Sequence, residues 1–218
     1  MLCARDTAVL NQAAGEIEKA GGTAAAIALD LRIPESPARL AEFAVGKFQR
    51  IDIVVNNAGA TKRGDFGALT EEDWTDGFAL KFFGAVRLTR AAWPHLKASS
   101  GSLLNISGIG GKTPGALFTI GGSVNAALIT FTKAIAETGV RDGVQVNAIN
   151  PGTIRTGRFQ QMLDSEKTTE QDFVRARRIT RIGEPEDIAN LVAFVVSPEG
   201  RFLHGAMIDM DGGSTKTI

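Results

Sequence analysis

Short apolar segments with the composition of buried β-strands alternate along this chain with longer segments that have helical spacing. The strand-like segments are residues 1–4, 23–29, 51–56, 102–107, 144–149 and 206–209. The helix-like segments are residues 7–20, 34–49, 71–96, 123–137 and 185–196. Alternation of this kind favours parallel strands joined by crossover helices. We therefore expect an α/β fold in which a doubly wound parallel sheet carries helices on both of its faces.

Two of these segments predict finer detail. The run 51–56 is apolar almost throughout, which is typical of a strand buried on both faces of a parallel sheet. The segment 71–96 is expected to be helical in two parts. Thr70 stands at its N-cap position and Asp73 three residues later, which is the spacing of a capping box.

Length and charge limit the class of protein. With 218 residues the chain is long enough to bury a substantial core, and we expect one domain over residues 1–218. Hydrophobic residues make up 44% and charged residues 22%, which excludes a disordered chain. Because 24 acidic residues balance 24 basic ones, no excess charge points to nucleic acid or to an anionic membrane surface.

The sequence also predicts a cytoplasmic location. Cys3 is the one cysteine, so no internal disulfide can form, and we expect it to be a small buried residue on a strand. No apolar run approaches the roughly 18 residues that span a bilayer, and the first residues lack the pattern of a signal peptide. His95 and His204 have no carboxylate or cysteine at metal-binding spacing, so no metal site is expected.

Five short motifs carry the most specific signal. They are Asn56-Asn57-Ala58-Gly59, Asn105-Ile106-Ser107, Thr132-Lys133-Ala134-Ile135-Ala136, Asn150-Pro151-Gly152-Thr153-Ile154-Arg155-Thr156 and Asp211-Gly212-Gly213. In their order and spacing these motifs resemble the short-chain dehydrogenase/reductase family. The resemblance covers nearly the whole chain and implies a Rossmann-like fold. It also implies an oxidoreductase that transfers hydride between a nicotinamide cofactor and a small carbonyl or alcohol substrate.

The resemblance also implies that a strand and a glycine-rich, phosphate-binding turn precede the first residues seen here. Neither is present in this sequence, so the chain is expected to begin within the second strand of the family. The missing strand lies in the middle of the family's sheet. Its two neighbours should each have an unpaired edge unless they pair directly or a partner fills the slot. We favour an N-terminally incomplete sequence over a repaired sheet.

Further residues match cofactor contacts of the family. Arg5 ends the first strand, where a basic residue favours NADP(H) over NAD(H), although the neighbouring Asp6 would partly oppose a phosphate; the alternative is a solvated arginine. Asp30 and Leu31 resemble the pair that borders the adenine. The expected cofactor-binding residues are Arg5, Asp30, Leu31, Asn57, Ala58, Gly59, Ile106, Pro151, Gly152, Ile154 and Thr156.

The catalytic positions of the family hold other residues here, and the chain contains no tyrosine. Counting from Lys133, the family's Tyr and Lys fall on Gly121 and Asn125. Its Ser falls on Gly108, and its helix Asn falls on Lys81. Glycine has no side chain that could protonate an alkoxide, so we expect the loss of at least the roughly 10²–10⁴-fold that acid–base catalysis supplies.

Lysine and asparagine thus appear exchanged between two helices. We hypothesise that Lys81 supplies the positive charge and that Ser107, Ser123 or Thr119 contributes a hydroxyl, with the amide of Asn125 nearby. The expected catalytic residues are Lys81, Ser107, Ser123 and Asn125. The alternative is that Lys81 is a surface lysine with its ammonium in solvent. Phe118, three residues before the tyrosine position, is expected to pack.

Two further expectations concern assembly and role. Phe82, Phe83, Val86, Trp93 and Phe131 are apolar residues on the two long helices, which in this family pack between subunits. The resemblance therefore implies a homodimer or homotetramer; ordinary core packing is the alternative. The substrate is not identifiable from sequence. The competing function is a non-catalytic relative that serves as a scaffold, regulator or ligand-binding module.

Overall fold

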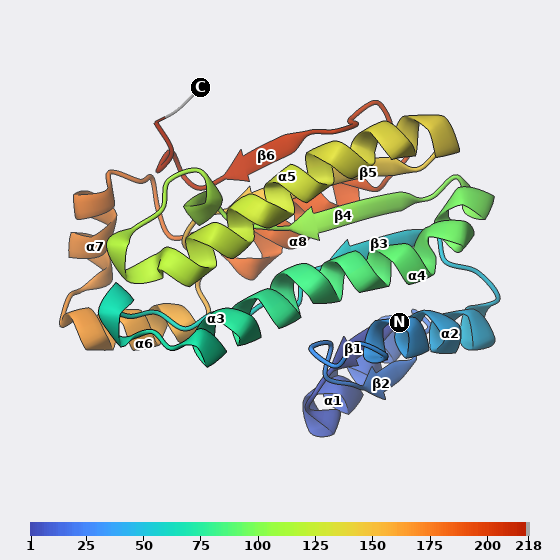
Figure 1. The fold of residues 1–218 in the computed structure, drawn as a ribbon, viewed down its shortest axis with the longest axis horizontal. Helices are drawn as coiled ribbons and strands as arrows, with labels where there is room; N and C mark the ends of the chain where they lie inside the picture. The colour runs from blue at the N-terminus through green and yellow to red at the C-terminus, as the bar shows by residue number, and fades with distance from the viewer. Residues whose placement is uncertain (217–218) are drawn as a thin grey trace.

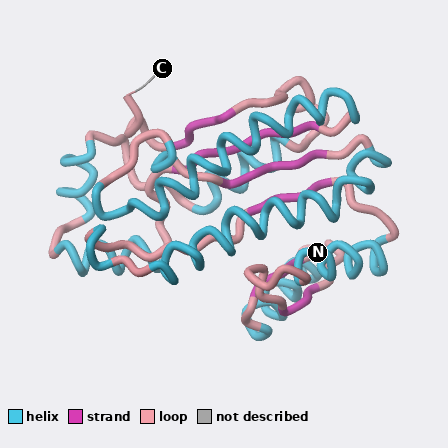
Figure 2. Tube along the Cα trace, viewed as in Figure 1, coloured by secondary structure: helices cyan, strands magenta, loops and turns pink. Residues whose placement is uncertain are grey.

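The computed structural model describes residues 1–216, apart from the side chains of residues 165 and 166. The strands in this range are β1 (Leu2–Ala4), β2 (Ala26–Ala28), β3 (Ile53–Asn56), β4 (Ser102–Ile106), β5 (Gln145–Pro151) and β6 (Met207–Met210). The α-helices are α1 (Thr7–Lys19), α2 (Ser36–Phe48), α3 (Glu71–Phe78), α4 (Gly84–Ser99), α5 (Thr119–Asp142), α6 (Gly157–Glu166), α7 (Glu170–Arg177) and α8 (Pro185–Val195). Figures 1 and 2 show their arrangement.

All strand pairs are parallel. Four strands form one sheet in the order β3–β4–β5–β6, and β1 and β2 form a second sheet. Helices α4 and α5 cover one face of the larger sheet, and α8 lies on the other (Figure 1). The expected α/β fold with a parallel sheet and helices on both faces is therefore confirmed.

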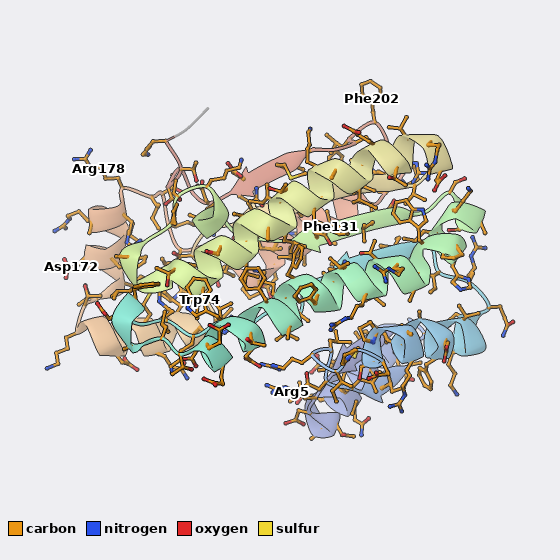
Figure 3. The ribbon with its side chains drawn as sticks, viewed as in Figure 1. Arg5, Trp74, Phe131, Asp172, Arg178 and Phe202 are labelled. Carbon is orange, nitrogen blue, oxygen red and sulfur yellow. The ribbon has the colours of Figure 1, made fainter. Side chains whose placement is uncertain are left out.

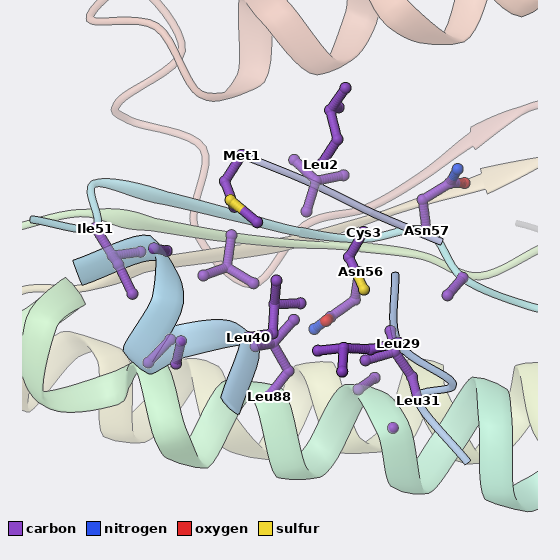
Figure 4. Close-up of a pocket in the computed structure, with 18 of the residues that line it drawn as sticks. Met1, Leu2, Cys3, Leu29, Leu31, Leu40, Ile51, Asn56, Asn57 and Leu88 are labelled. Atoms are coloured by element: carbon purple, nitrogen blue, oxygen red, sulfur yellow. The ribbon is translucent and has the colours of Figure 1, made fainter. Parts of the chain in front are cut away.

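The two sheets are separated where β1 and β3 face each other. In the described part of the chain, β1 pairs with β2 and β3 pairs with β4, so each has one edge without a partner strand. The two edges do not pair directly. Between them lies a cavity of about 970 Å³, whose apolar lining includes Leu2, Leu40 and Leu88 (Figure 4).

The prediction that the run 51–56 is buried on both faces is wrong. Val54 and Asn56 are buried on the side of α4, but Ile53 and Val55 point the other way and are 46% and 39% exposed. The reason lies in the layers, since α1 packs on the small sheet and α8 packs on β5. The outer face of β3 lines the open cavity instead.

Local sequence signals explain most helix starts. The capping box of α3 is confirmed: Asp73 N donates to Thr70 Oγ1 at 3.3 Å, and Thr70 N donates to the Asp73 carboxylate at 3.0 Å. Helix α5 starts at Thr119, four residues before the expected start. Its first turn contains Gly122, where an added Cβ would lie 3.1 Å from both Gly110 O and Pro114 Cβ. Glycine there lets the helix begin against the preceding loop.

The core lies on both faces of the larger sheet. Ala92 and Leu96 of α4 pack with Leu103 and Val146 on one face. On the other face, Val195 of α8 packs with residues of β4 and β5. Among the described residues, no helix combines the length and the apolar character that crossing a membrane requires.

Candidate cofactor and active site

The carboxyl ends of β3, β4 and β5 lie at the same edge of the sheet because the strands are parallel. The loops that leave this edge contain the motifs singled out in the sequence: residues 57–59 after β3, residues 107–111 after β4 and residues 152–156 after β5. Ligands of open α/β sheets bind at this edge. The candidate site is therefore built from these loops and from the helices that pack against them.

Lys81 enters the site from a π-helical turn. Residues 79–83 form this turn between α3 and α4, and single π-turns inside helices are often found at functional sites. The ammonium Nζ donates a hydrogen bond of 2.7 Å to Ser107 O at the end of β4. A side chain at Gly59 would collide with it, since an added Cβ would lie 2.9 Å from Lys81 Cδ. The alternative of a lysine with its ammonium in solvent is therefore wrong.

The position of Lys81 changes its acidity. Burial and, as the smaller cause, the positive charge of Arg158 together lower the pKa of Lys81 from its ordinary 10.5 to about 8. Arg158 lies close by, with Nη2 donating to Gly59 O at 2.7 Å. At pH 7 about ten ammonium groups are still protonated for each neutral amine. Lys81 can thus act as a proton donor near neutral pH.

A phenylalanine ring fills the space beside Gly121. An added Cβ at Gly121 would lie 2.0 Å from Cζ of Phe118, and one at Gly110 would lie 2.9 Å from Cε1 of the same ring. Arg63 stacks over the ring, with its guanidinium carbon 4.9 Å from the centroid. The expectation that Phe118 packs is confirmed. Its ring takes the volume into which any side chain at position 121 would have to grow.

Asn125 fills the space beside Gly108 in a similar way. An added Cβ at Gly108 would lie 2.8 Å from Asn125 Nδ2. The residue is 4% exposed, and its Oδ1 has no hydrogen-bond partner among the described residues. A buried amide oxygen without a donor is unusual. It remains able to accept a hydrogen bond from a bound molecule.

The structure separates the three candidate hydroxyls. Ser107 Oγ donates to Asn125 O at 2.9 Å, so its proton already has an acceptor in the protein. Ser123 is exposed, and it lies roughly 200° around α5 from the buried Asn125. The structure therefore does not place Ser123 beside Asn125 in the candidate site. Thr119 Oγ1 is buried and has no hydrogen-bond partner in the described chain. Thr119 is therefore the hydroxyl that remains uncommitted.

Six of the expected cofactor-binding residues line the large cavity: Arg5, Asp30, Leu31, Asn57, Ala58 and Gly59 (Figure 4). The exposed side chain of Arg5 follows β1, and its charge helps to lower the pKa of Asp30. The larger cause of that lowered pKa is the hydrogen bond from Arg32 N at 3.0 Å. The guanidinium of Arg32 also pairs with Asp76 at the end of α3.

The other expected cofactor residues lie outside that cavity. Ile106 is buried at the end of β4, and Pro151 ends β5. Gly152 packs against the Asp211 turn, where an added Cβ would lie 2.7 Å from Asp211 Cα. Ile154 lines a separate pocket of about 120 Å³. Thr156 is the N-cap residue of α6, without a side-chain capping bond.

The sequence interpretation missed Arg63 and Arg158. Both lie next to recognised motifs, Arg63 four residues after Gly59 and Arg158 two residues after Thr156. That proximity was the available signal. It could not show that one guanidinium contacts Gly59 and the other covers Phe118, because both contacts join segments far apart in the chain.

Comparison with known proteins gives consistent matches. The model of the family described as enoyl-(acyl carrier protein) reductase matches residues 1–215. An uncharacterised oxidoreductase of Mycobacterium tuberculosis (strain CDC 1551 / Oshkosh) is 36% identical over 217 residues, which are 99% of this chain and 82% of that protein. A 3-oxoacyl-[acyl-carrier-protein] reductase of Vibrio cholerae is 30% identical over 194 residues, which are 88% of this chain and 78% of that protein.

A solved structure matches over the whole chain. It is the crystal structure of L-sorbose reductase from Gluconobacter frateurii in complex with NADPH and L-sorbose, with a TM-score of 0.94 and 29% sequence identity. The match covers 100% of this chain and 87% of that one. The arrangement of strands and helices is thus shared with a dinucleotide-binding reductase.

Proposed function

Since this chain belongs to the short-chain dehydrogenase/reductase family, we propose that it is an NADP(H)-dependent oxidoreductase of small carbonyl or alcohol substrates in which Lys81 is the proton donor. One observation carries the proposal. The Lys81 ammonium is held inside the candidate site by Ser107 O, with a pKa of about 8. The chain has no tyrosine, so another residue has to supply the proton that the family's tyrosine supplies.

The chain's residues fit a phosphorylated dinucleotide at the adenosine end. Arg5 offers an exposed cation for a 2′-phosphate, and Asp30 and Leu31 line the same cavity. Gly59 keeps the backbone accessible where a side chain would collide with Lys81. A bound nicotinamide cofactor would supply the hydride. NADPH in the matching L-sorbose reductase structure supports the choice of NADP(H) over NAD(H).

Carbonyl reduction requires a proton at the oxygen that becomes an alkoxide, and the donor works best when its pKa is near the working pH. Lys81 carries three N–H donors, of which one has its acceptor in Ser107 O. The remaining N–H groups can point at the developing alkoxide and stabilise its charge before transferring a proton. Thr119 Oγ1, which is buried without a partner, is the hydroxyl available to assist.

A non-catalytic, ligand-binding role is the second candidate, and two observations favour it. Phe118 fills the space at Gly121, and the Ser107 hydroxyl is bonded to Asn125 O. A site that had lost its catalytic groups would close in this way. Such a protein would bind NADP(H) without turning over a substrate.

The test compares the Lys81→Met variant with the wild-type chain. NADPH affinity is measured by fluorescence titration, and turnover is measured with a panel of ketones, aldehydes and alcohols. We expect a loss of about 10²–10⁴-fold in kcat with the NADPH Kd unchanged. Lys19→Met on the exposed end of α1 is the matched control and should leave both unchanged. Binding without turnover by the wild type would favour the second candidate, and unchanged kcat in Lys81→Met would exclude Lys81 as the acid.

We propose further that α5 and α4, together with the π-helical turn that precedes α4, form a subunit interface. Phe82 makes edge-to-face contacts with Phe78, Phe83 and Phe131, with centroid separations of 6.1, 5.3 and 6.2 Å. Phe131 lies between the two helices (Figure 3), while Phe83 is 45% exposed. An exposed ring beside an aromatic cluster suits contact with a second copy. Phe83→Glu should lower the mass measured by sedimentation equilibrium, and an unchanged mass would contradict this interface.

A further inference from the structure

Arg158 presents an uncommitted guanidinium at the candidate site. Its Nη2 donates to Gly59 O at 2.7 Å, and this is its one hydrogen bond to the described residues. A guanidinium carries five N–H donors in a planar fork, so four remain for a ligand. The ion pairs of the described residues do not include Arg158. Its neighbour Arg155, in contrast, is held by Glu170 and Glu184.

Lys81 and Arg158 are two cations placed against the same residue. Arg158 contacts the oxygen of Gly59, and the Lys81 side chain fills the space where a Gly59 Cβ would be. The charge of Arg158 makes protonation of Lys81 less favourable, so the two groups repel each other. No carboxylate of the described chain lies within ion-pair distance of either group. An anion bound at Arg158 would remove this cost.

A third cation, Arg63, contacts the Phe118 ring. The Arg63 guanidinium lies over the Phe118 ring, which in turn packs against Gly110 and Gly121. Arg63, like Arg158, has no acidic partner among the described residues, whereas the adjacent Lys62 is paired with Asp73 at 2.8 Å. The described residues around these glycines therefore include three cations without a carboxylate partner and one buried acceptor without a donor, Asn125 Oδ1.

We propose that this site selects carbonyl substrates that carry an anionic oxygen group, a carboxylate or a phosphate, and that Arg158 binds that group while Lys81 faces the carbonyl. The proposal rests on the oxidoreductase function proposed above and names its substrate class. The planar fork of arginine matches carboxylate and phosphate through paired hydrogen bonds. Because the Arg158 guanidinium and the carbon chain of Lys81 both lie against Gly59, one small molecule can reach the two cations together.

The test uses matched pairs of substrates that differ in charge. Pyruvate is compared with methyl pyruvate, and dihydroxyacetone phosphate with dihydroxyacetone, each with saturating NADPH. The 218-residue chain is assayed as wild type, Arg158→Gln and Arg158→Lys. Arg39→Gln, an exposed arginine on α2, is the control. We expect the wild type to prefer one or both anionic members. Arg158→Gln should lower kcat/KM for the anion by about 10–100-fold and change the neutral member little.

The two substrate pairs also distinguish a carboxylate-binding site from a phosphate-binding site. A loss confined to pyruvate assigns a carboxylate, and a loss confined to dihydroxyacetone phosphate assigns a phosphate. Arg158→Lys should restore part of the loss, because it keeps the charge and removes the fork. Equal losses for charged and neutral substrates, together with a weaker NADPH Kd, would overturn the proposal by assigning Arg158 to the cofactor's phosphates.

A failure of the proposed oxidoreductase function can be distinguished from a failure of the anion site. If the wild type turns over no member of the panel, binding is measured instead by calorimetry with pyruvate and with inorganic phosphate. Binding that Arg158→Gln abolishes and Arg39→Gln preserves would support the anion site without any catalysis. No binding of either anion by the wild type would overturn it.

Discussion

The packing of Phe118 against Gly121 leads to a quantitative prediction about stability. An alanine at position 121 would place its Cβ 2.0, 2.1 and 2.6 Å from three atoms of the Phe118 ring. Ordinary carbon–carbon contacts are about 3.5–4.0 Å, so the ring must move by roughly 1.5 Å or more. Overpacking of this kind costs about 1–3 kcal/mol, against a gain of about 1 kcal/mol from replacing glycine inside a helix. Gly121→Ala should therefore lower the free energy of unfolding by up to about 2 kcal/mol.

The same substitution should have the opposite effect once the ring is removed. In a Phe118→Ala background these three close contacts of the new Cβ are gone, and we expect the helix-propensity gain of about 1 kcal/mol to dominate. Urea unfolding of the wild type, the two single variants and the double variant gives the coupling free energy. We expect about 1–3 kcal/mol, equal to the overpacking cost.

Gly15→Ala in the middle of α1 is the matched control, because an added Cβ there has nothing within 4 Å. It should stabilise the chain by about 1 kcal/mol in both backgrounds. If Gly121→Ala stabilises the wild type as much as Gly15→Ala does, or if the coupling is below about 0.5 kcal/mol, the Phe118 ring does not occupy the space beside position 121.

Further measurements test other parts of the molecule. Because reduction needs the protonated form of Lys81, its rate should fall about tenfold per pH unit above pH 8, and a profile flat to pH 9.5 would contradict the assignment. The unfolded chain binds more protons between pH 8 and 10.5, so Lys81 makes the free energy of unfolding rise with pH across that window; in Lys81→Met this rise should be smaller. Asn105→Ala would leave Asn56 Nδ2 without its 2.8 Å acceptor and Thr132 Oγ1 without its 2.8 Å donor, so urea unfolding should show a loss of more than about 2 kcal/mol. Val55→Lys at the unpaired edge of β3 should slow aggregation, measured by light scattering, because a charge on an exposed strand edge opposes pairing with another chain. An aggregation rate equal to that of the wild type would argue that this edge does not mediate the association.

The fold could be predicted largely because strand composition and helix caps are local. Each strand lies inside a segment expected from the sequence or differs from it by one or two residues at its end, and the capping box of α3 is set by residues three apart. The exposure of Ile53 and Val55 could not be predicted from their apolar character. It depends on whether another layer covers β3, and that is decided by elements far away in the chain.

The site could be predicted only in part. Motif positions indicated which loops meet at the sheet edge, because parallel strands end together. They did not show that the Ser107 hydroxyl is bonded to Asn125 O, that Ser123 is on an exposed face of α5, or that Arg158 reaches Gly59. Each of these depends on a side chain's direction or on a contact across about 20 to 100 residues, and no local spacing rule contains that information.

The exchange of lysine and asparagine that the family resemblance implies is compatible with the packing between the sheet edge and the helices. The Lys81 side chain occupies the space opened by Gly59, and the Asn125 amide occupies the space opened by Gly108. Both spaces adjoin Ser107, which accepts from the Lys81 ammonium through its carbonyl and donates to Asn125 O through its hydroxyl. A second ammonium here would add to the repulsion that Arg158 already exerts, and a second amide in place of lysine would leave no acid. One ammonium and one amide are thus compatible with the space and the charge around Ser107. The catalytic role that we propose for Lys81 therefore rests on the space that its side chain fills and on its contact with Ser107 O, and the position at which the family places its lysine holds Asn125.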